Sequence, residues 1–312
     1  MFFITTMPNP EHFSTERENI IENIENGDNE EIREEGEPWN EKFEVDGNQL
    51  EICFTGRKES EAETGKDLSE INKIELITPE NKRFDFSSLL PEGWKFERID
   101  ESSPVFNMGT AHVEKSIHIP KSYRETKSRW TAEGEALPPS YQEEDRGREV
   151  NPWGEITEWK NVSTLNNPEA PIVLLHEIGH AHQARNRKGE KIRKKIEETE
   201  KKEQEKATPI SLTRQEMELY YQHVVAIERD AWAYALNKYR ELKKEGIDIL
   251  PKAKTNREVL DIVNNGVNSY LTKIIHYTQF KEVKRELAKR KKTTIQEILG
   301  KLKTILNTEN SQ

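Results

Sequence analysis

The residues of this sequence best suited to chemistry are two histidines and a glutamate at helical spacing. His176, Glu177 and His180 stand in the motif HEIGH. Residues i and i+4 of a helix lie on one face, one turn apart, so that both imidazoles can reach a single ion. Zn²⁺ accepts neutral imidazole nitrogen and favours a tetrahedral shell. Glu177, which follows the first ligand, is expected to contact a water at the metal instead of binding the metal itself.

The residues before the motif favour a buried site. Residues 172–175 read IVLL and are all apolar, so the helix is expected to be buried where the histidines lie. Burying two histidines and a glutamate is unfavourable unless they have partners, and a metal ion would supply one. The competing interpretation is two surface histidines on a charged helix, because HExxH also occurs by chance. The apolar residues argue against it.

A third ligand is expected in the segment ERDAWAYAL, further along the chain. Glu228 has apolar neighbours one and two turns away on the predicted helix, and a carboxylate in such surroundings needs a partner. Asp230 also lies among apolar residues and is the competing candidate. If Glu228 is the ligand, Asp230 becomes a candidate to hold a ligating imidazole by its other N–H. Two histidines and one carboxylate leave a fourth position open for water, as in catalytic zinc sites.

Together, HEIGHAH and ERDAWAYA resemble the gluzincin branch of the zincin metallopeptidases, and most of all the small intracellular enzymes of the ImmA/IrrE type. In that pattern a glutamate is followed three residues later by alanine, then by aromatic and small residues. Here these are Glu228, Ala231, Tyr234 and Ala235. Trp232 departs from the pattern, because relatives often have Asn or Asp there. The resemblance spans residues 170–239, under a quarter of the chain, and it favours Glu228 over Asp230 as third ligand.

The resemblance implies a zinc-dependent metalloendopeptidase with one Zn²⁺ per chain, acting on a peptide or protein substrate. A metal-activated water would attack the peptide bond with Glu177 as general base. The same ligands could also take Mn²⁺, Fe²⁺ or Co²⁺. Tyr220, Tyr221 and His223 are candidates for the donor that stabilises the oxyanion, with packing as the alternative for each. The family fold also implies an edge strand to which a peptide adds. Residues 116–120 are the candidate strand, and an ordinary core strand is the alternative.

Two other functions stay open at this point. A regulatory or protein-interaction protein could use a metallopeptidase-like domain without proteolysis. The presence of Glu177 argues against this function, because a pure zinc scaffold does not need that residue. A helical interaction protein with a chance HExxH would bind no metal.

The chain is predicted to be an α+β protein of three parts. Residues 1–40 form an acidic arm that is predicted to be disordered. Residues 41–280 form a zincin-like metallopeptidase domain, in which a small twisted sheet over about 42–120 packs on a helical half over about 166–280. Residues 281–312 form a basic, amphipathic C-terminal helix.

Local patterns predict the individual elements. Residues 43–56 surround an Asp-Gly turn and predict a hairpin. Residues 73–79 and 83–86 predict short strands, and a further strand is predicted to end at Pro120. No elements are assigned with certainty between residues 121 and 164.

The helical half begins with a helix that has Asn167 as N-cap, Pro168 at its first position and Gly189 past its end. A charged helix over 189–206, a long helix ending at Gly246 and a helix over 257–276 are predicted to follow.

The composition narrows the function classes. A net charge of −10 provides no general attraction to nucleic acid. The single cysteine, Cys53, excludes an internal disulfide and a cysteine-based zinc cluster. No apolar run approaches the ~20 residues that span a membrane, and no sorting signal is evident, so a cytoplasmic protein is expected. The apolar stripe of the C-terminal helix is expected to pack on the domain, on a second copy or on another partner.

Overall fold

The computed structural model describes residues 38–58, 68–103, 108–112, 114–130, 141–142, 146–150, 155–183, 213–277 and 281–307. All of them belong to one compact unit, residues 35–312. Residues 1–37 of the predicted acidic arm, and the charged helix predicted over 189–206, lie outside the described residues.

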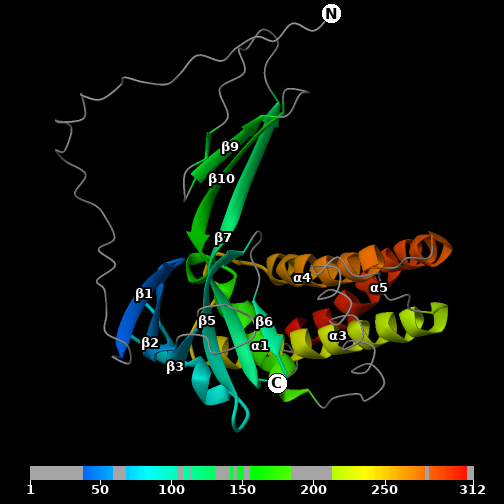
Figure 1. Cartoon of the computed structure of the whole chain (residues 1–312). Coiled ribbons are helices and arrows are strands. Elements are labelled where there is room, and N and C mark those ends of the chain that lie inside the picture. Colours follow the sequence, from blue (N-terminus) through cyan, green and yellow to red (C-terminus); the bar gives the residue numbers. More distant parts are fainter. Residues whose placement is uncertain are drawn as a thin grey trace, which may run out of the picture. The chain divides into compact units, whose positions relative to one another are not determined.

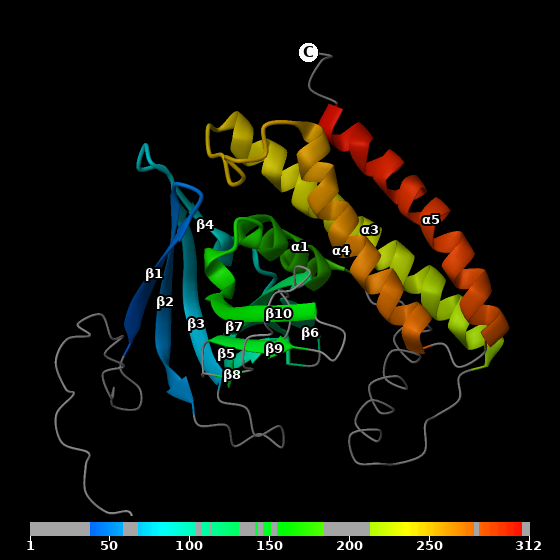
Figure 2. The same ribbon diagram turned by 90° about the horizontal axis from the view of Figure 1, so that it is seen from above.

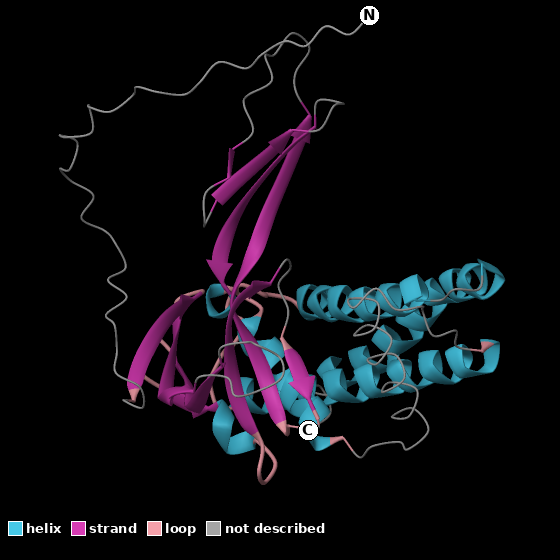
Figure 3. Cartoon of the chain, viewed as in Figure 1, coloured by secondary structure: helices cyan, strands magenta, loops and turns pink. Residues whose placement is uncertain are grey.

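The described strands form one mixed sheet beside a group of long helices (Figures 1 and 3). The strand order is β1-β2-β3-β5-β7-β10-β9-β8, with β4 beside β3 and β6 beside β7. Only the β5–β7 pair is parallel among the described pairs. The bounds are β1 Trp39–Val45, β2 Asn48–Lys58, β3 Leu68–Ile77, β4 Arg83–Asp85, β5 Lys95–Ser103, β6 Gly109–Ala111, β7 Ser116–Trp130, β8 Tyr141–Gln142, β9 Arg146–Val150 and β10 Glu155–Ser163.

The first strands form where apolar–polar alternation predicts them. β1 and β2 are a hairpin whose two turn residues, Asp46 and Gly47, both have positive φ. That backbone matches the twist of the flanking strands in a two-residue turn. Ile52, Ile74 and Phe96 point from β2, β3 and β5 into one core. The predicted hairpin and the two short strands after it are confirmed.

The prediction that a strand ends at Pro120 is wrong, because β7 continues to Trp130. Proline is tolerated in a strand where no ladder bond is required of its nitrogen. On one side of β7, Pro120 lies in such an interval, because β6 pairs with β7 up to His118 and β10 pairs with it from Ser122 onwards. On the other side Pro120 is opposite Ile99 of β5, directly before the register of that pair is interrupted. The sheet therefore extends well past residue 120 and includes much of the stretch left unassigned from the sequence.

Four α-helices follow the sheet: α1 Ala170–His182, α3 Arg214–Lys244, α4 Asn256–Tyr277 and α5 Lys281–Asn307. Two short 3₁₀ helices, η1 Phe86–Leu89 and η2 Thr164–Asn166, lie at the ends of strands. α1 begins later than predicted, with Pro171 in its first turn instead of Pro168, and Asn167 accepts a hydrogen bond from the Glu169 backbone N–H ahead of the helix. It also ends earlier than the predicted stop at Gly189, because the backbone of Gln183 is already extended. Proline fits either first turn, because the nitrogens there need no helical partner.

The remaining helices match the predicted segments closely. α3 starts with a capping box between Thr213 and Glu216. α3, α4 and α5 pack against one another, and α1 lies between α3 and the sheet (Figure 2). The apolar stripe of α5, including Ile298 and Leu302, is buried in this contact. The stripe therefore packs on the rest of the chain, the first of the three expected alternatives.

The protein is an α+β fold, as predicted. Among the described helices, none has an apolar stretch long enough to cross a membrane.

Candidate metal centre

The HEIGH motif lies on a helix that is buried almost throughout. α1 runs beside the sheet and α3, and His176, Glu177 and His180 are only 2%, 2% and 6% exposed. Of the four apolar residues that precede the motif, Ile172, Leu174 and Leu175 are fully covered and Val173 is partly buried. The surface-histidine interpretation is therefore excluded.

α1 and α3 touch where both have a small residue. A Cβ placed on Gly179 would lie 2.8 Å from the Ala231 carbonyl oxygen and 3.0 Å from its Cα. Only glycine allows this approach, since real Cβ atoms do not come so near backbone atoms. Glu228 lies one helical turn before Ala231 and thereby reaches the histidines.

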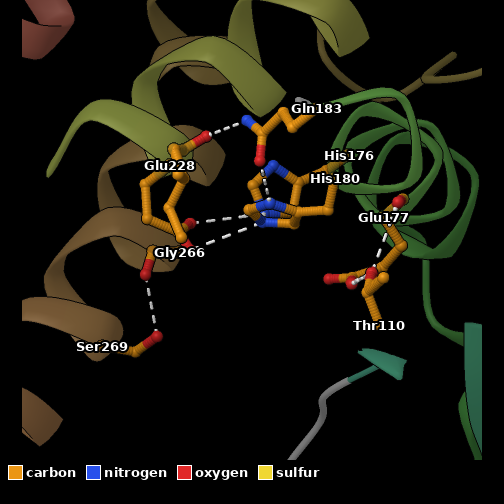
Figure 4. Close-up of polar contacts among 9 residues, drawn as sticks. Thr110, His176, Glu177, His180, Gln183, Glu228, Gly266 and Ser269 are labelled. Atoms are coloured by element: carbon orange, nitrogen blue, oxygen red, sulfur yellow. Dashed lines mark hydrogen bonds and ion pairs between the residues drawn. The ribbon is translucent and has the colours of Figure 1, made fainter. Parts of the chain in front are cut away.

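His176, His180 and Glu228 bring their ligand atoms together (Figure 4). The two Nε2 atoms are 3.0 Å apart, and they lie 3.3 Å and 3.4 Å from the Glu228 carboxylate oxygens. We call these three residues the α1–α3 cluster. Glu228 is 2% exposed, and no lysine or arginine of the described residues pairs with it.

These distances suit a small divalent cation. Ligand atoms about 2.0–2.1 Å from a tetrahedral zinc ion are about 3.3–3.4 Å from one another. Two imidazole nitrogens and a carboxylate oxygen are also ligands that zinc accepts. The α1–α3 cluster can therefore hold a metal ion with little rearrangement, and the donor set does not distinguish Zn²⁺ from Mn²⁺, Fe²⁺ or Co²⁺.

In the metal-free chain, Glu228 and His180 shift each other's pKa values in opposite directions. Burial would raise the pKa of Glu228, but the charge and hydrogen bonds of His180 and His176 lower this pKa to about 2. Burial would lower the pKa of His180, but the carboxylate of Glu228 raises this pKa to about 9. At neutral pH the metal-free cluster therefore keeps a proton on His180, and a metal ion would displace it.

Glu177 does not belong to the group of three possible ligands, and its side chain is held by the sheet. Its carboxylate accepts a hydrogen bond of 2.6 Å from the Thr110 hydroxyl on β6 (Figure 4). Among the described residues β6 pairs with β7 alone. Residues 116–120, the candidate edge strand, instead begin β7, with β5 on one side and β6 on the other over residues 116–118. The edge beside the site is therefore β6, and this part of β7 is a core strand.

Gln183, which the sequence did not single out, holds the second histidine. The Nδ1 atom of His180 is 3.0 Å from the Gln183 side-chain oxygen, and the Gln183 amide donates to the Ile227 carbonyl on α3. Asp230 was the candidate for this kind of role. Its side chain is instead 55% exposed and pairs with Arg229. Two residues along a helix correspond to about 200°, so Asp230 faces away from the side that carries Glu228.

Of the three predicted oxyanion donors, Tyr221 has a side-chain contact that directs it to α5. Tyr221 is buried, but its hydroxyl donates to Thr294 of α5 at 3.0 Å. Tyr220 and His223 are half-buried on α3. A residue missed from the sequence, Tyr270 of α4, is a further candidate. The charge of Glu177, then burial, then the charge of Glu228 raise the pKa of Tyr270 well above its usual value.

Tyr270 therefore stays a neutral hydrogen-bond donor near the general-base candidate. It lies far along the chain from HEIGH, and only the packing of α4 brings it near the motif.

No protein-family model, curated protein or solved structure matches this chain, so the zincin resemblance rests on the motifs and on the geometry of the α1–α3 cluster.

Proposed function

We propose that the protein is a zinc-dependent metalloendopeptidase with a zincin-like fold and one zinc ion per chain. The observation that carries the proposal is the buried convergence of His176, His180 and Glu228 at ligand distances, with Glu177 buried on the same helix directly after His176. A buried acidic group balanced only by two imidazoles is well suited to a divalent cation.

The side chains around the cluster have complementary roles. Zinc, when bound, would activate water as a nucleophile and polarise a peptide carbonyl. Glu177 takes the proton of the attacking water and passes it to the leaving amine. Thr110 keeps the Glu177 carboxylate oriented by donating to one of its oxygens. Tyr270, which remains protonated, is the group that would donate to the developing oxyanion.

The strand β6 supports a peptide as the substrate. It lies at the sheet edge next to α1, and it carries Thr110. An extended peptide that adds to this edge by backbone hydrogen bonds would run past the general base. We infer an unfolded or loop segment as the substrate, because only an extended chain can pair in this way.

The test compares the zinc-loaded wild type with Glu177→Gln on a library of unstructured peptides. The amide keeps the size of the side chain but cannot take a proton, so we expect cleavage to fall by about 10²–10⁴-fold while zinc content is unchanged. Asp230→Asn is the matched control and should cleave like the wild type. A wild type that binds zinc but cleaves no peptide would favour a regulatory metallopeptidase-like domain instead.

A further inference from the structure

The two histidines of the α1–α3 cluster are supported in different ways. The Nδ1 atom of His180 has a partner in Gln183. The Nδ1 atom of His176 is buried and has no hydrogen-bond partner among the described residues. Imidazoles that bind a metal usually donate their other N–H to an acceptor, which fixes the orientation of the ring. Something else must orient His176.

An aromatic ring lies against His176 instead. The rings of His176 and Trp232 are stacked, with centroids 4.2 Å apart and an interplanar angle of 28°. Trp232 is 2% exposed, and its indole N–H also has no hydrogen-bond partner among the described residues. The contact is therefore one between ring faces, and stacked aromatic pairs of this kind add stabilisation beyond that of area burial alone.

The indole is in turn held by α4, a helix that contributes no ligand. A Cβ placed on Gly266 would lie 2.6 Å from Cζ2 of Trp232 and 3.3 Å from its Cε2. The absence of a side chain at Gly266 thus allows the indole to occupy this position. A methyl group there would push the ring, because close-packed interiors transmit such displacements.

We propose that Trp232 is the positioning residue of the first metal ligand, and that Gly266 holds it in place. Stacking on the indole orients His176, where a hydrogen-bond acceptor would do so in most metal sites. The inference rests on the proposed metal function. Because Gly266 lies on α4 and Trp232 on α3, this arrangement makes metal affinity depend on the packing of α4 against α3.

The test measures zinc affinity by competition with a chromogenic chelator, together with the thermal unfolding of each metal-free protein. The variants are Gly266→Ala, Trp232→Leu and Trp232→Phe, and the control is Gly300→Ala on α5, where a Cβ would meet no atom within 4 Å. We expect Gly266→Ala and Trp232→Leu to weaken zinc binding about 10–100-fold, as for other groups that orient a ligand. Trp232→Phe keeps a stacking face and should lose only a few-fold. Gly300→Ala should bind like the wild type.

The absorption spectrum of the cobalt-loaded protein separates positioning from stability. We expect the ligand-field bands of Gly266→Ala to shift relative to wild type, while those of Gly300→Ala do not. If Gly266→Ala and Trp232→Leu bind zinc within twofold of wild type, whatever their unfolding temperatures, the positioning role is wrong and the metal function stands. If Trp232→Leu does not fold, Gly266→Ala and Trp232→Phe decide. A wild type that binds no zinc overturns both proposals.

Discussion

Within the part of the chain that the structure describes, glutamate is buried beside histidine in two places, and the two places differ in where the balancing positive charge comes from. In the α1–α3 cluster, the carboxylate of Glu228 is balanced by the imidazoles of His176 and His180 and by no lysine or arginine of the described residues. On β5 and β7, Glu97 is 8% exposed and contacts His118, Ser116 and the ammonium group of Lys95. We call these four residues the sheet cluster.

The difference shows what distinguishes a structural acid–base group from a candidate metal centre. In the sheet cluster a lysine and a hydroxyl satisfy the carboxylate, so no further cation is needed. Ser116 and Glu97 also contact the same nitrogen of His118, at 2.9 Å and 3.3 Å, so the group lacks the relay geometry of a catalytic triad. In the α1–α3 cluster the second histidine takes the place of the lysine. The cation there must be a proton or a metal ion.

The largest effect that tests this contrast is the increase in the free energy of unfolding when zinc is added. We expect zinc in ~1,000-fold excess over its dissociation constant to stabilise the metal-free wild type by about 4 kcal/mol, measured by thermal unfolding with and without zinc. Glu228→Gln should lose this response and Glu97→Gln should keep it. An equal response in both variants would mean that the two clusters do not differ as described.

A smaller effect on the free energy of unfolding is expected when the pH is lowered and Glu97 of the sheet cluster becomes protonated. The hydrogen bond with His118, opposed by burial and joined by Lys95 and Ser116, lowers the pKa of Glu97 from 4.5 to about 2. A carboxyl whose pKa is lower in the folded state stabilises the fold above its unfolded pKa, and this contribution is lost as pH falls toward about 2. At pH 7, metal-free Glu97→Gln should therefore be less stable than wild type by about 1–3 kcal/mol.

Urea unfolding at pH 7 and at pH 3 measures this difference, which should shrink at the lower pH. The control is Glu125→Gln, whose half-exposed carboxylate pairs with Lys160 and should change stability by less than about 1 kcal/mol. A difference that is the same at both pH values would show that Glu97 does not titrate as a stabilising carboxylate.

Most of the secondary structure follows from local pattern, and the exceptions have physical causes. Alternation around Asp46 and Gly47 predicts the first hairpin, because turn type and strand twist are local properties. The strand predicted to end at Pro120 continues, because the effect of a proline depends on which neighbouring strand pairs there. Strand order is a tertiary property, which is why β6 and not residues 116–120 forms the edge beside α1.

The residues of the candidate site also fall into those that local pattern predicts and those that only tertiary packing brings together. His176 and His180 are predictable because i and i+4 share a helix face, and apolar neighbours predict that Glu228 is buried. The same argument failed for Asp230: residues 228 and 230 lie about 200° apart on a helix, so only one of them can face the histidines, and apolar neighbours alone did not decide which. Thr110, Gln183 and Tyr270 reach the site through β6, the end of α1 and α4, and no pattern in the sequence predicts how these elements pack.

The central claim is that the α1–α3 cluster binds a metal ion through Glu228. Elemental analysis of the purified wild type, Glu228→Ala and Asp230→Ala after zinc is supplied tests it most directly. We expect about one zinc per chain in the wild type and in Asp230→Ala, and almost none in Glu228→Ala. Absence of stoichiometric metal from the wild type, or full retention of zinc by Glu228→Ala, would contradict the claim.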